Sequence, residues 1–139
     1  YFREFRGDIL FSMARPAESA NAYDEAIQLR PNSPQILVNL GRALIATGDT
    51  DQLPQAIMAL ADARNMEPDW SFTHRQLGIA YGKFGQLNLA DMSLAEEAIL
   101  RRDNARAVQL AKRVLAREDS DASLHSRAQD IVFTYGSTE

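Results

Sequence analysis

A spacing of 34 to 37 residues between equivalent glycines and prolines is the feature that most constrains this sequence. Gly7 and Gly41 are 34 residues apart, Gly41 and Gly78 are 37 residues apart, and Pro31 and Pro68 share the 37-residue offset. A period of this length is typical of stacked two-helix units, in which each unit buries its apolar face against its neighbours. The repeat therefore limits the chain to a small set of helical repeat architectures.

The residues around each glycine resemble the tetratricopeptide repeat. Leu40 precedes Gly41 and a large residue, Leu44, follows three positions later; in the second half of the unit Ala56 is followed by Leu60 four positions later. Glycine lets the second helix of a pair approach closely, and the larger side chains fill the wedge between pairs. Three extra residues of the second unit fall within 49–54, where a turn between helices can absorb them.

Apolar periodicity and end signals predict eight helices, over 1–13, 16–30, 34–47, 52–66, 70–84, 87–101, 104–117 and 121–133. Glu97 and Arg102 stand where the third unit should carry a small residue and a proline, so helix 87–101 both ends that unit and opens a half-regular fourth one. The expected fold is all-α, a right-handed helical solenoid of about 3.5 repeats with a C-terminal capping helix. Its predicted units are about 1–32, 33–69, 70–102 and 103–133, followed by a tail over 134–139.

Composition excludes several classes of function. The chain of 139 residues has no cysteine, which rules out disulfide scaffolds, iron–sulfur clusters and thiol nucleophiles in it. A net charge of −4 argues against nucleic acid as a partner, and no apolar run approaches the roughly 20 residues that a membrane span needs. His74 and His125 lie in separate predicted helices without a metal motif, so we predict no metal, no cofactor and no catalytic residue in this chain.

Two charged stretches have plain structural interpretations. Glu96 and Glu97 are adjacent, and adjacent helical residues point about 100° apart, so we expect an exposed helix face and not an acid/base pair. The basic stretch over 101–117 contains Arg101, Arg106 and Arg117, but neighbouring acidic residues offset much of its charge. We interpret it as a solvated face, with contact to another domain as the second reading.

The sharper hypothesis is a groove for a partner peptide. In such solenoids the first helix of each pair lines the concave side, where an extended or helical peptide can lie. Arg42 and Arg75 come from similar levels of adjacent first helices, and two guanidinium groups could hold a carbonyl or a carboxylate. The alternative is that they pair with Asp8 or Glu4 and maintain the shape of the superhelix. The candidate groove residues are Asp8, Phe11, Asn39, Arg42, Ile45, Phe72, Arg75, Gln76, Ile79 and Lys83.

Several stretches together resemble the C-terminal tetratricopeptide region of bacterial envelope zinc metallopeptidases, the beta-barrel-assembly-enhancing protease group. The resemblance covers nearly all of the chain and rests on short sequence segments, most of them within predicted helices. They are Phe2-Arg3-Glu4-Phe5-Arg6-Gly7-Asp8-Ile9-Leu10-Phe11, Pro31-Asn32-Ser33-Pro34, Arg75-Gln76-Leu77-Gly78-Ile79-Ala80-Tyr81-Gly82, the run 90–102, Ala107, Arg113 and Arg127-Ala128-Gln129-Asp130-Ile131.

The resemblance implies a recognition role in the periplasm for a chain that is itself no enzyme. In that family a separate N-terminal H-E-x-x-H domain holds zinc and the catalytic glutamate, and none of that motif is present here. The implied partners are envelope or outer-membrane proteins and the N-terminal protease domain. The alternative is a stand-alone tetratricopeptide scaffold that assembles a protein complex with no enzyme attached.

Overall fold

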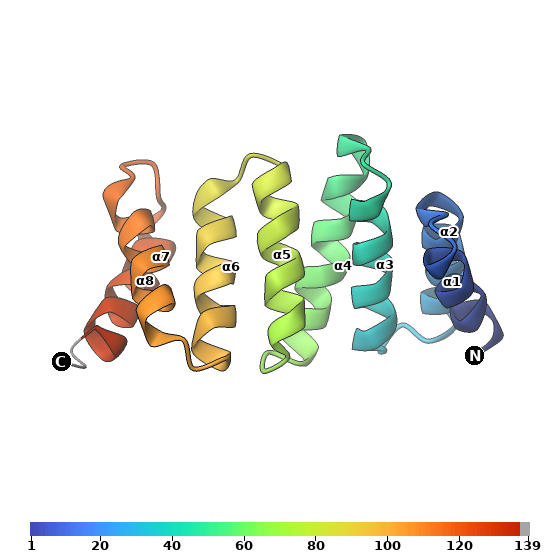
Figure 1. The fold of residues 1–139 in the computed structure, drawn as a ribbon, viewed down its shortest axis with the longest axis horizontal. Helices are drawn as coiled ribbons and strands as arrows, with labels where there is room; N and C mark the ends of the chain where they lie inside the picture. Colours follow the sequence, from blue (N-terminus) through green and yellow to red (C-terminus); the bar gives the residue numbers. More distant parts are fainter. Residues whose placement is uncertain (137–139) are drawn as a thin grey trace. The chain divides into compact units, whose positions relative to one another are not determined.

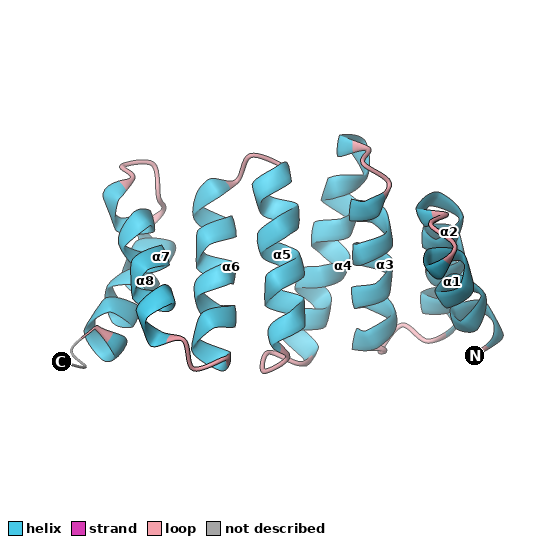
Figure 2. Cartoon of the chain, viewed as in Figure 1, coloured by secondary structure: helices cyan, strands magenta, loops and turns pink. Residues whose placement is uncertain are grey.

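The computed structural model describes residues 1–136, and these residues form helices and no strand (Figures 1 and 2). The all-α prediction is therefore confirmed. The eight helices are α1 (Phe2–Ser12), α2 (Pro16–Leu29), α3 (Pro34–Ala46), α4 (Leu53–Met66), α5 (Ser71–Lys83), α6 (Leu87–Leu100), α7 (Asn104–Ala116) and α8 (Ala122–Tyr135), with a short 3-10 turn over Thr50–Gln52.

The predicted helix ends agree with the structure to within one or two residues, and the largest consequence is at the last helix. We expected a tail from residue 134, but α8 continues to Tyr135. Tyr135 lies one helical turn beyond Ile131 and packs against the apolar core, which extends the helix. Gly136 follows as the C-cap of α8, and the remaining residues of the predicted tail, 137–139, lie outside the described residues.

The chain divides into two compact units, and each is described by itself. Unit 1 comprises residues 1–68 with α1 to α4, and unit 2 begins at residue 69 and contains α5 to α8. Within each unit every helix packs against the next one along the chain, and in unit 2 α6 also contacts α8. Short connections make successive helices antiparallel, as the ribbon shows for α5 and α6 (Figure 1).

The repeated glycines mark the close approach of paired helices. A Cβ atom at Gly41 of α3 would lie 2.5 Å from Cγ of Leu60 in α4, and one at Gly7 would lie 2.7 Å from the ring of Tyr23. In unit 2 a Cβ at Gly78 would lie 2.6 Å from Cδ2 of Leu94. Tyr23 and Leu60 are completely buried. The spacing that identified the repeat is therefore a packing requirement in each helix pair.

The core of unit 2 continues through α6, α7 and α8. Small alanines dominate this cluster, which lets the three helices approach closely around a few larger side chains. Its buried members are Met92, Ala95, Ala98, Ala107, Leu110, Ala111, Val114, Ala128 and Ile131. The terminal helix α8 therefore covers apolar surface of α6 and α7, as expected of a capping helix.

The turn after α6 has the same form as the turn after α5. In the turn after α5, the Gln86 N–H donates to the Tyr81 carbonyl at 2.9 Å around Gly85, whose φ is +83°. In the turn after α6, the Asp103 N–H donates to the Ala98 carbonyl at 2.8 Å around Arg102, whose φ is +62°. Proline cannot adopt a positive φ, which explains why the proline expected at position 102 is replaced. Helix α6 therefore ends as the first helix of a pair ends.

Candidate functional site

In unit 1, the Arg42 guanidinium lies over an aromatic ring of the neighbouring first helix. Its Cζ is 4.2 Å from the ring centroid of Phe11, so both predicted groove residues meet in a cation–π contact. Arg42 makes no ion pair with any residue in 1–136, and its buried Nε has no hydrogen-bond partner there. Arg42 is thus a fixed cation whose charge is not neutralised by a neighbouring carboxylate.

The carboxylates that were expected to pair with Arg42 have other partners. Asp8 accepts a hydrogen bond of 2.5 Å from the hydroxyl of Tyr23, and Glu4 lies 4.0 Å from Nη1 of Arg30. Burial and the hydrogen bond to Asp8 raise the pKa of the Tyr23 phenol far above its usual range, so this hydrogen bond stays intact at neutral pH. The alternative interpretation, an Arg42 ion pair with Asp8 or Glu4, is wrong.

The remaining groove candidates differ in exposure. Asn39 and Ile45 on α3 are half-buried, as are Phe72 and Ile79 on α5, while Lys83 is exposed. Gln76 is buried, with 8% of its surface exposed, which leaves it little area for contact with a partner. The proposed common wall of α3 and α5 draws on both units and stays a prediction.

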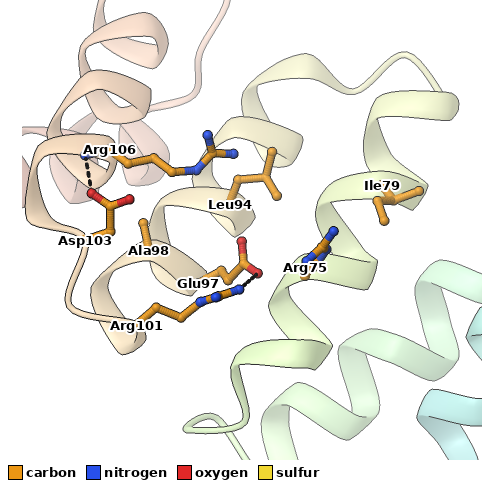
Figure 3. Close-up of a pocket in the computed structure, with 8 residues that line it drawn as sticks. All are labelled: Arg75, Ile79, Leu94, Glu97, Ala98, Arg101, Asp103 and Arg106. Atoms are coloured by element: carbon orange, nitrogen blue, oxygen red, sulfur yellow. Dashed lines mark hydrogen bonds and ion pairs between the residues drawn. The ribbon is translucent and has the colours of Figure 1, made fainter.

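In unit 2, two of the predicted residues line a pocket of about 550 Å³ (Figure 3). Arg75 and Ile79 come from α5, and the other walls come from α6 and the start of α7. The pocket is lined by Arg75, Ile79, Leu94, Glu97, Ala98, Arg101, Asp103 and Arg106. Sequence reasoning therefore located one wall of this pocket and missed the other two.

The pocket combines three arginines with two carboxylates that are already engaged. Arg101 lies 3.8 Å from Oε2 of Glu97, one helical turn earlier in α6. The Asp103 side chain accepts a hydrogen bond of 3.2 Å from the Arg106 backbone N–H and so caps α7. The guanidinium groups of Arg75 and Arg106 make no hydrogen bond or ion pair with the described residues. The pocket therefore carries two unpaired cations.

The expectation of an exposed Glu96–Glu97 face is wrong. Glu97 is buried, with 7% of its surface exposed, and Glu96 is held by Arg127 of α8 at 2.6 Å. That hydrogen bond raises the pKa of Arg127 above its usual range. The replacement of a small residue by Glu97 in the repeat frame was the signal that could have indicated a polar pocket here.

The basic stretch is also less solvated than expected. Arg113 and Arg117 of α7 lie 3.2 and 2.7 Å from the carboxylate of Asp91 in α6, and Asp91 is 5% exposed. Arg117 also donates to the side chain of Asn88 at 3.1 Å. This end of the stretch therefore links α7 to α6. A solvated face is the wrong interpretation for Arg117, whose side chain is 28% exposed, but it holds for Arg113, whose side chain is 58% exposed.

Among residues 1–136, no group of three or more His, Asp or Glu side chains is placed to hold a metal ion. No helix in the same part of the chain is long and apolar enough to cross a membrane.

Comparison with known proteins indicates the repeat family. Residues 7–48 match the family model of the TPR (tetratricopeptide) repeat. The TPR repeat-containing thioredoxin TTL4 of Arabidopsis thaliana is 29% identical over 80 residues, which is 58% of this chain and 11% of that protein. The chain thus spans about a tenth of the length of this curated relative. A crystal structure of a thermophilic TPR protein of Thermus thermophilus aligns with a TM-score of 0.34 and 16% identity, covering 94% of this chain and 97% of that one.

Proposed function

We propose, proceeding from the tetratricopeptide repeats of this chain, that each unit binds a segment of a partner protein, unit 1 around Arg42 of α3 and unit 2 around Arg75 of α5. Tetratricopeptide repeats serve as scaffolds for protein–protein interaction, and this coarser role follows from the match itself. The observation that carries the finer proposal is that Arg42 and Arg75, one in each unit, have no carboxylate partner among the described residues.

The chemistry of these two arginines suits a peptide. A guanidinium group presents several N–H donors in a planar fork, which matches carbonyl and carboxylate oxygens. The Phe11 ring fixes the Arg42 side chain in advance, so less conformational freedom is lost when a partner binds. The same ring and the half-buried Phe72 provide apolar surface beside the cations for side chains of the partner.

More specifically, we propose that this chain is an accessory domain of a periplasmic zinc metallopeptidase. The support is the resemblance of the stretches 2–11, 75–82 and 90–102 to the beta-barrel-assembly-enhancing protease group. In that setting the partners are envelope or outer-membrane proteins and the N-terminal protease domain, which would hold the zinc. This chain would then contribute recognition to envelope protein quality control and no catalytic residue.

The alternative is a tetratricopeptide scaffold with no protease attached. The Arabidopsis relative is by its name a thioredoxin, so repeats of this kind occur beside other chemistry in that protein. This chain has no cysteine and cannot supply thiol chemistry itself. The full-length gene separates the two settings: an upstream signal sequence and an H-E-x-x-H motif support the first, and a gene without them overturns it.

A binding titration tests the proposed role. The 139-residue chain is titrated with unfolded outer-membrane-protein segments, and separately with the N-terminal protease domain if the gene encodes one. We compare wild type with Arg42→Ala, Arg75→Ala and the double variant, and use Lys112→Ala, an exposed cation of α7, as the charge-matched control. We expect at least a tenfold loss of affinity for the segment in the double variant, with unchanged helix content by circular dichroism. Equal affinity of the double variant and Lys112→Ala for the segment would contradict the proposal.

A further inference from the structure

The pocket between α5, α6 and α7 indicates which kind of side chain the partner segment carries. This inference rests on the proposed function. We infer that this pocket takes the side-chain carboxylate of a Glu or Asp residue that lies next to an apolar residue in an extended partner segment. None of the known similarities assigns this site, and it draws on Arg106, which lies outside the set of groove candidates.

The net positive charge of the pocket favours the binding of an anion. The three guanidinium groups of Arg75, Arg101 and Arg106 face two carboxylates, which leaves one net positive charge. Glu97 is engaged with Arg101 at 3.8 Å, and Asp103 is engaged with the backbone of α7. Arg75 and Arg106 come from different helices and line opposite walls, as Figure 3 shows. A single carboxylate between them could accept hydrogen bonds from both of these guanidinium groups and would bring the net charge of the pocket to zero.

The shape and lining of the pocket favour a carboxylate attached to an apolar neighbour. Ile79, Leu94 and Ala98 line the pocket together with the arginines, so an apolar side chain can be buried in the same pocket as the carboxylate. Its volume of about 550 Å³ is within the range of roughly 300–1,000 Å³ that is usual for ligand pockets. A phosphate backbone fits less well, because nucleic-acid binding needs a continuous basic surface and the whole chain carries a net charge of −4.

This pocket differs from the two-carboxylate clamp of chaperone-binding tetratricopeptide domains. The clamp uses Lys and Asn on successive first helices and takes the free C-terminus of a peptide. Here only Asn39 fits that clamp among the corresponding positions, which hold Glu4, Asp8, Asn39, Phe72 and Gln76, whereas the cations of the pocket are Arg75 of α5, Arg101 directly after α6 and Arg106 of α7. The inference is therefore tied to a side-chain carboxylate within a segment.

The test uses peptides with both ends blocked, so that no terminal charge can contribute. An acetylated and amidated peptide of about twelve residues carries one Glu between two Leu residues, and its control carries Gln at the same place. Fluorescence anisotropy measures binding to the full chain. We expect the Glu peptide to bind about tenfold more tightly than the Gln peptide, because one charge-assisted contact is of that size. Raising the salt concentration should reduce this preference.

Variants of the chain separate the pocket from the rest of the surface. Arg106→Gln should abolish the preference for Glu, and its side chain has no partner in the described residues whose loss would disturb folding. Glu97→Gln should increase the preference severalfold, because it removes a competing negative charge. Lys112→Gln, the matched control on the outer part of α7, should leave the preference unchanged.

The outcomes distinguish this inference from the proposed function. Equal binding of the Glu and Gln peptides overturns it, as does binding that requires a free C-terminus or a single-stranded oligonucleotide that competes better than the Glu peptide. If the unfolded segments still bind in a manner that depends on Arg42 and Arg75, the proposed function survives that failure. If neither the segments nor the peptides bind, both are wrong.

Discussion

The two units join neighbouring helices by different polar contacts on the same apolar pattern. In unit 1 the ion pairs between α1 and α2 are long and half-exposed: Arg3 and Glu25 are 3.4 Å apart with 50% of each side chain exposed. In unit 2 the Asp91 side chain is only 7% exposed and holds Arg117 at 2.7 Å. Unit 1 instead joins α1 and α2 by uncharged donors: the Tyr23 hydroxyl donates to Asp8 in a partly buried hydrogen bond, and the buried Ser19 hydroxyl donates to the Gly7 carbonyl at 2.7 Å.

The difference shows which contacts define the repeat and which were added to it. The glycine against a Leu or Tyr of the next helix recurs at Gly7, Gly41 and Gly78, so it belongs to the repeat itself. The buried charges described above occur where the repeat frame becomes irregular, in α6 and α7. Unit 2 therefore uses arginine–carboxylate pairs where its sequence has lost the regular proline-ended unit.

The largest predicted loss of stability is at Asp91, and it tests the difference between the polar contacts of the two units. Asp91→Ala should lower the free energy of unfolding by about 2 kcal/mol, because it leaves Arg113 and Arg117 without their carboxylate; removing one partner of a fully buried pair costs more. Glu25→Ala, which removes the exposed pair of unit 1, should cost well under ~1 kcal/mol. Urea denaturation measures both, and hydrogen exchange should place the Asp91 effect in α6 and α7. Similar losses in the two variants would remove the distinction between the units.

A slightly smaller effect should test what the units share. Gly78→Ala should destabilise the chain by about 1–2 kcal/mol, because the new Cβ would lie 2.6 Å from Leu94, and Gly41→Ala should do the same against Leu60. Gly82→Ala in the same helix α5 is the matched control, since its Cβ would have 3.9 Å to its nearest neighbour. That control should stabilise the chain by about 0.5 kcal/mol through helix propensity. Thermal melts of the three variants measure this, and a stabilising Gly78→Ala would contradict the close approach.

A gain of stability is expected at the irregular turn of unit 2. Arg102 has a φ of +62°, a conformation that costs a side-chain-bearing residue about 1 kcal/mol or more. Arg102→Gly should therefore raise the free energy of unfolding by about 0.5–1 kcal/mol, and Ala14→Gly, at φ +55° in unit 1, should act alike. Arg102→Ala is the control and should change little, since the Cβ penalty remains. Equal stability of the Gly and Ala variants at position 102, measured by urea denaturation, would contradict the strain at this turn.

Features that depend on sequence spacing, such as the helix pairs, could be predicted from the sequence. Features that depend on which helix packs against which could not. The helix pairs and the glycine seams follow from a fixed period, so the close approach of a second helix at Gly41 could be predicted from the repeat alone. The burial of Glu97 and Asp91 could not, because a helical pattern shows which residues share a face and does not show which helix covers it. The pocket needs three helices at once, and only Arg75 and Ile79 were on the predicted surface.

The partner of Asp8 illustrates the same limit within unit 1. Tyr23 packs against Gly7 as Leu60 packs against Gly41, and the sequence alone suggested Arg42 as a partner of Asp8. The ring of Tyr23 lies against Gly7, and its hydroxyl donates a hydrogen bond to Asp8. Arg42 instead makes a cation–π contact with the ring of Phe11. An apolar position filled by Tyr in place of Leu therefore carries a hydrogen bond that the pattern does not reveal.

The pH dependence of stability gives a further prediction about the difference between the two units. The folded state raises the pKa of Tyr23 above its ordinary value of 10.0, mainly by burial and then by the bond to Asp8. The stability contributed by the protonated phenol is therefore fully present below about pH 10 and is lost as the pH rises above it. At about pH 10.5 the loss should be about 1 kcal/mol.

Tyr23→Phe supplies the comparison for this measurement, because it lacks the titrating group. Urea denaturation between about pH 8 and pH 10.5 should show the stability advantage of wild type over Tyr23→Phe shrinking with pH. The Glu96–Arg127 contact of unit 2 should not follow, since the pKa of Arg127 is raised and its charge persists throughout this range. Hydrogen exchange at the two ends of the pH range, corrected for the intrinsic pH dependence of exchange, should therefore locate the weakening in α1 and α2. A wild-type advantage that stays constant over the range would mean that the Tyr23 hydroxyl titrates alike in the folded and unfolded chain.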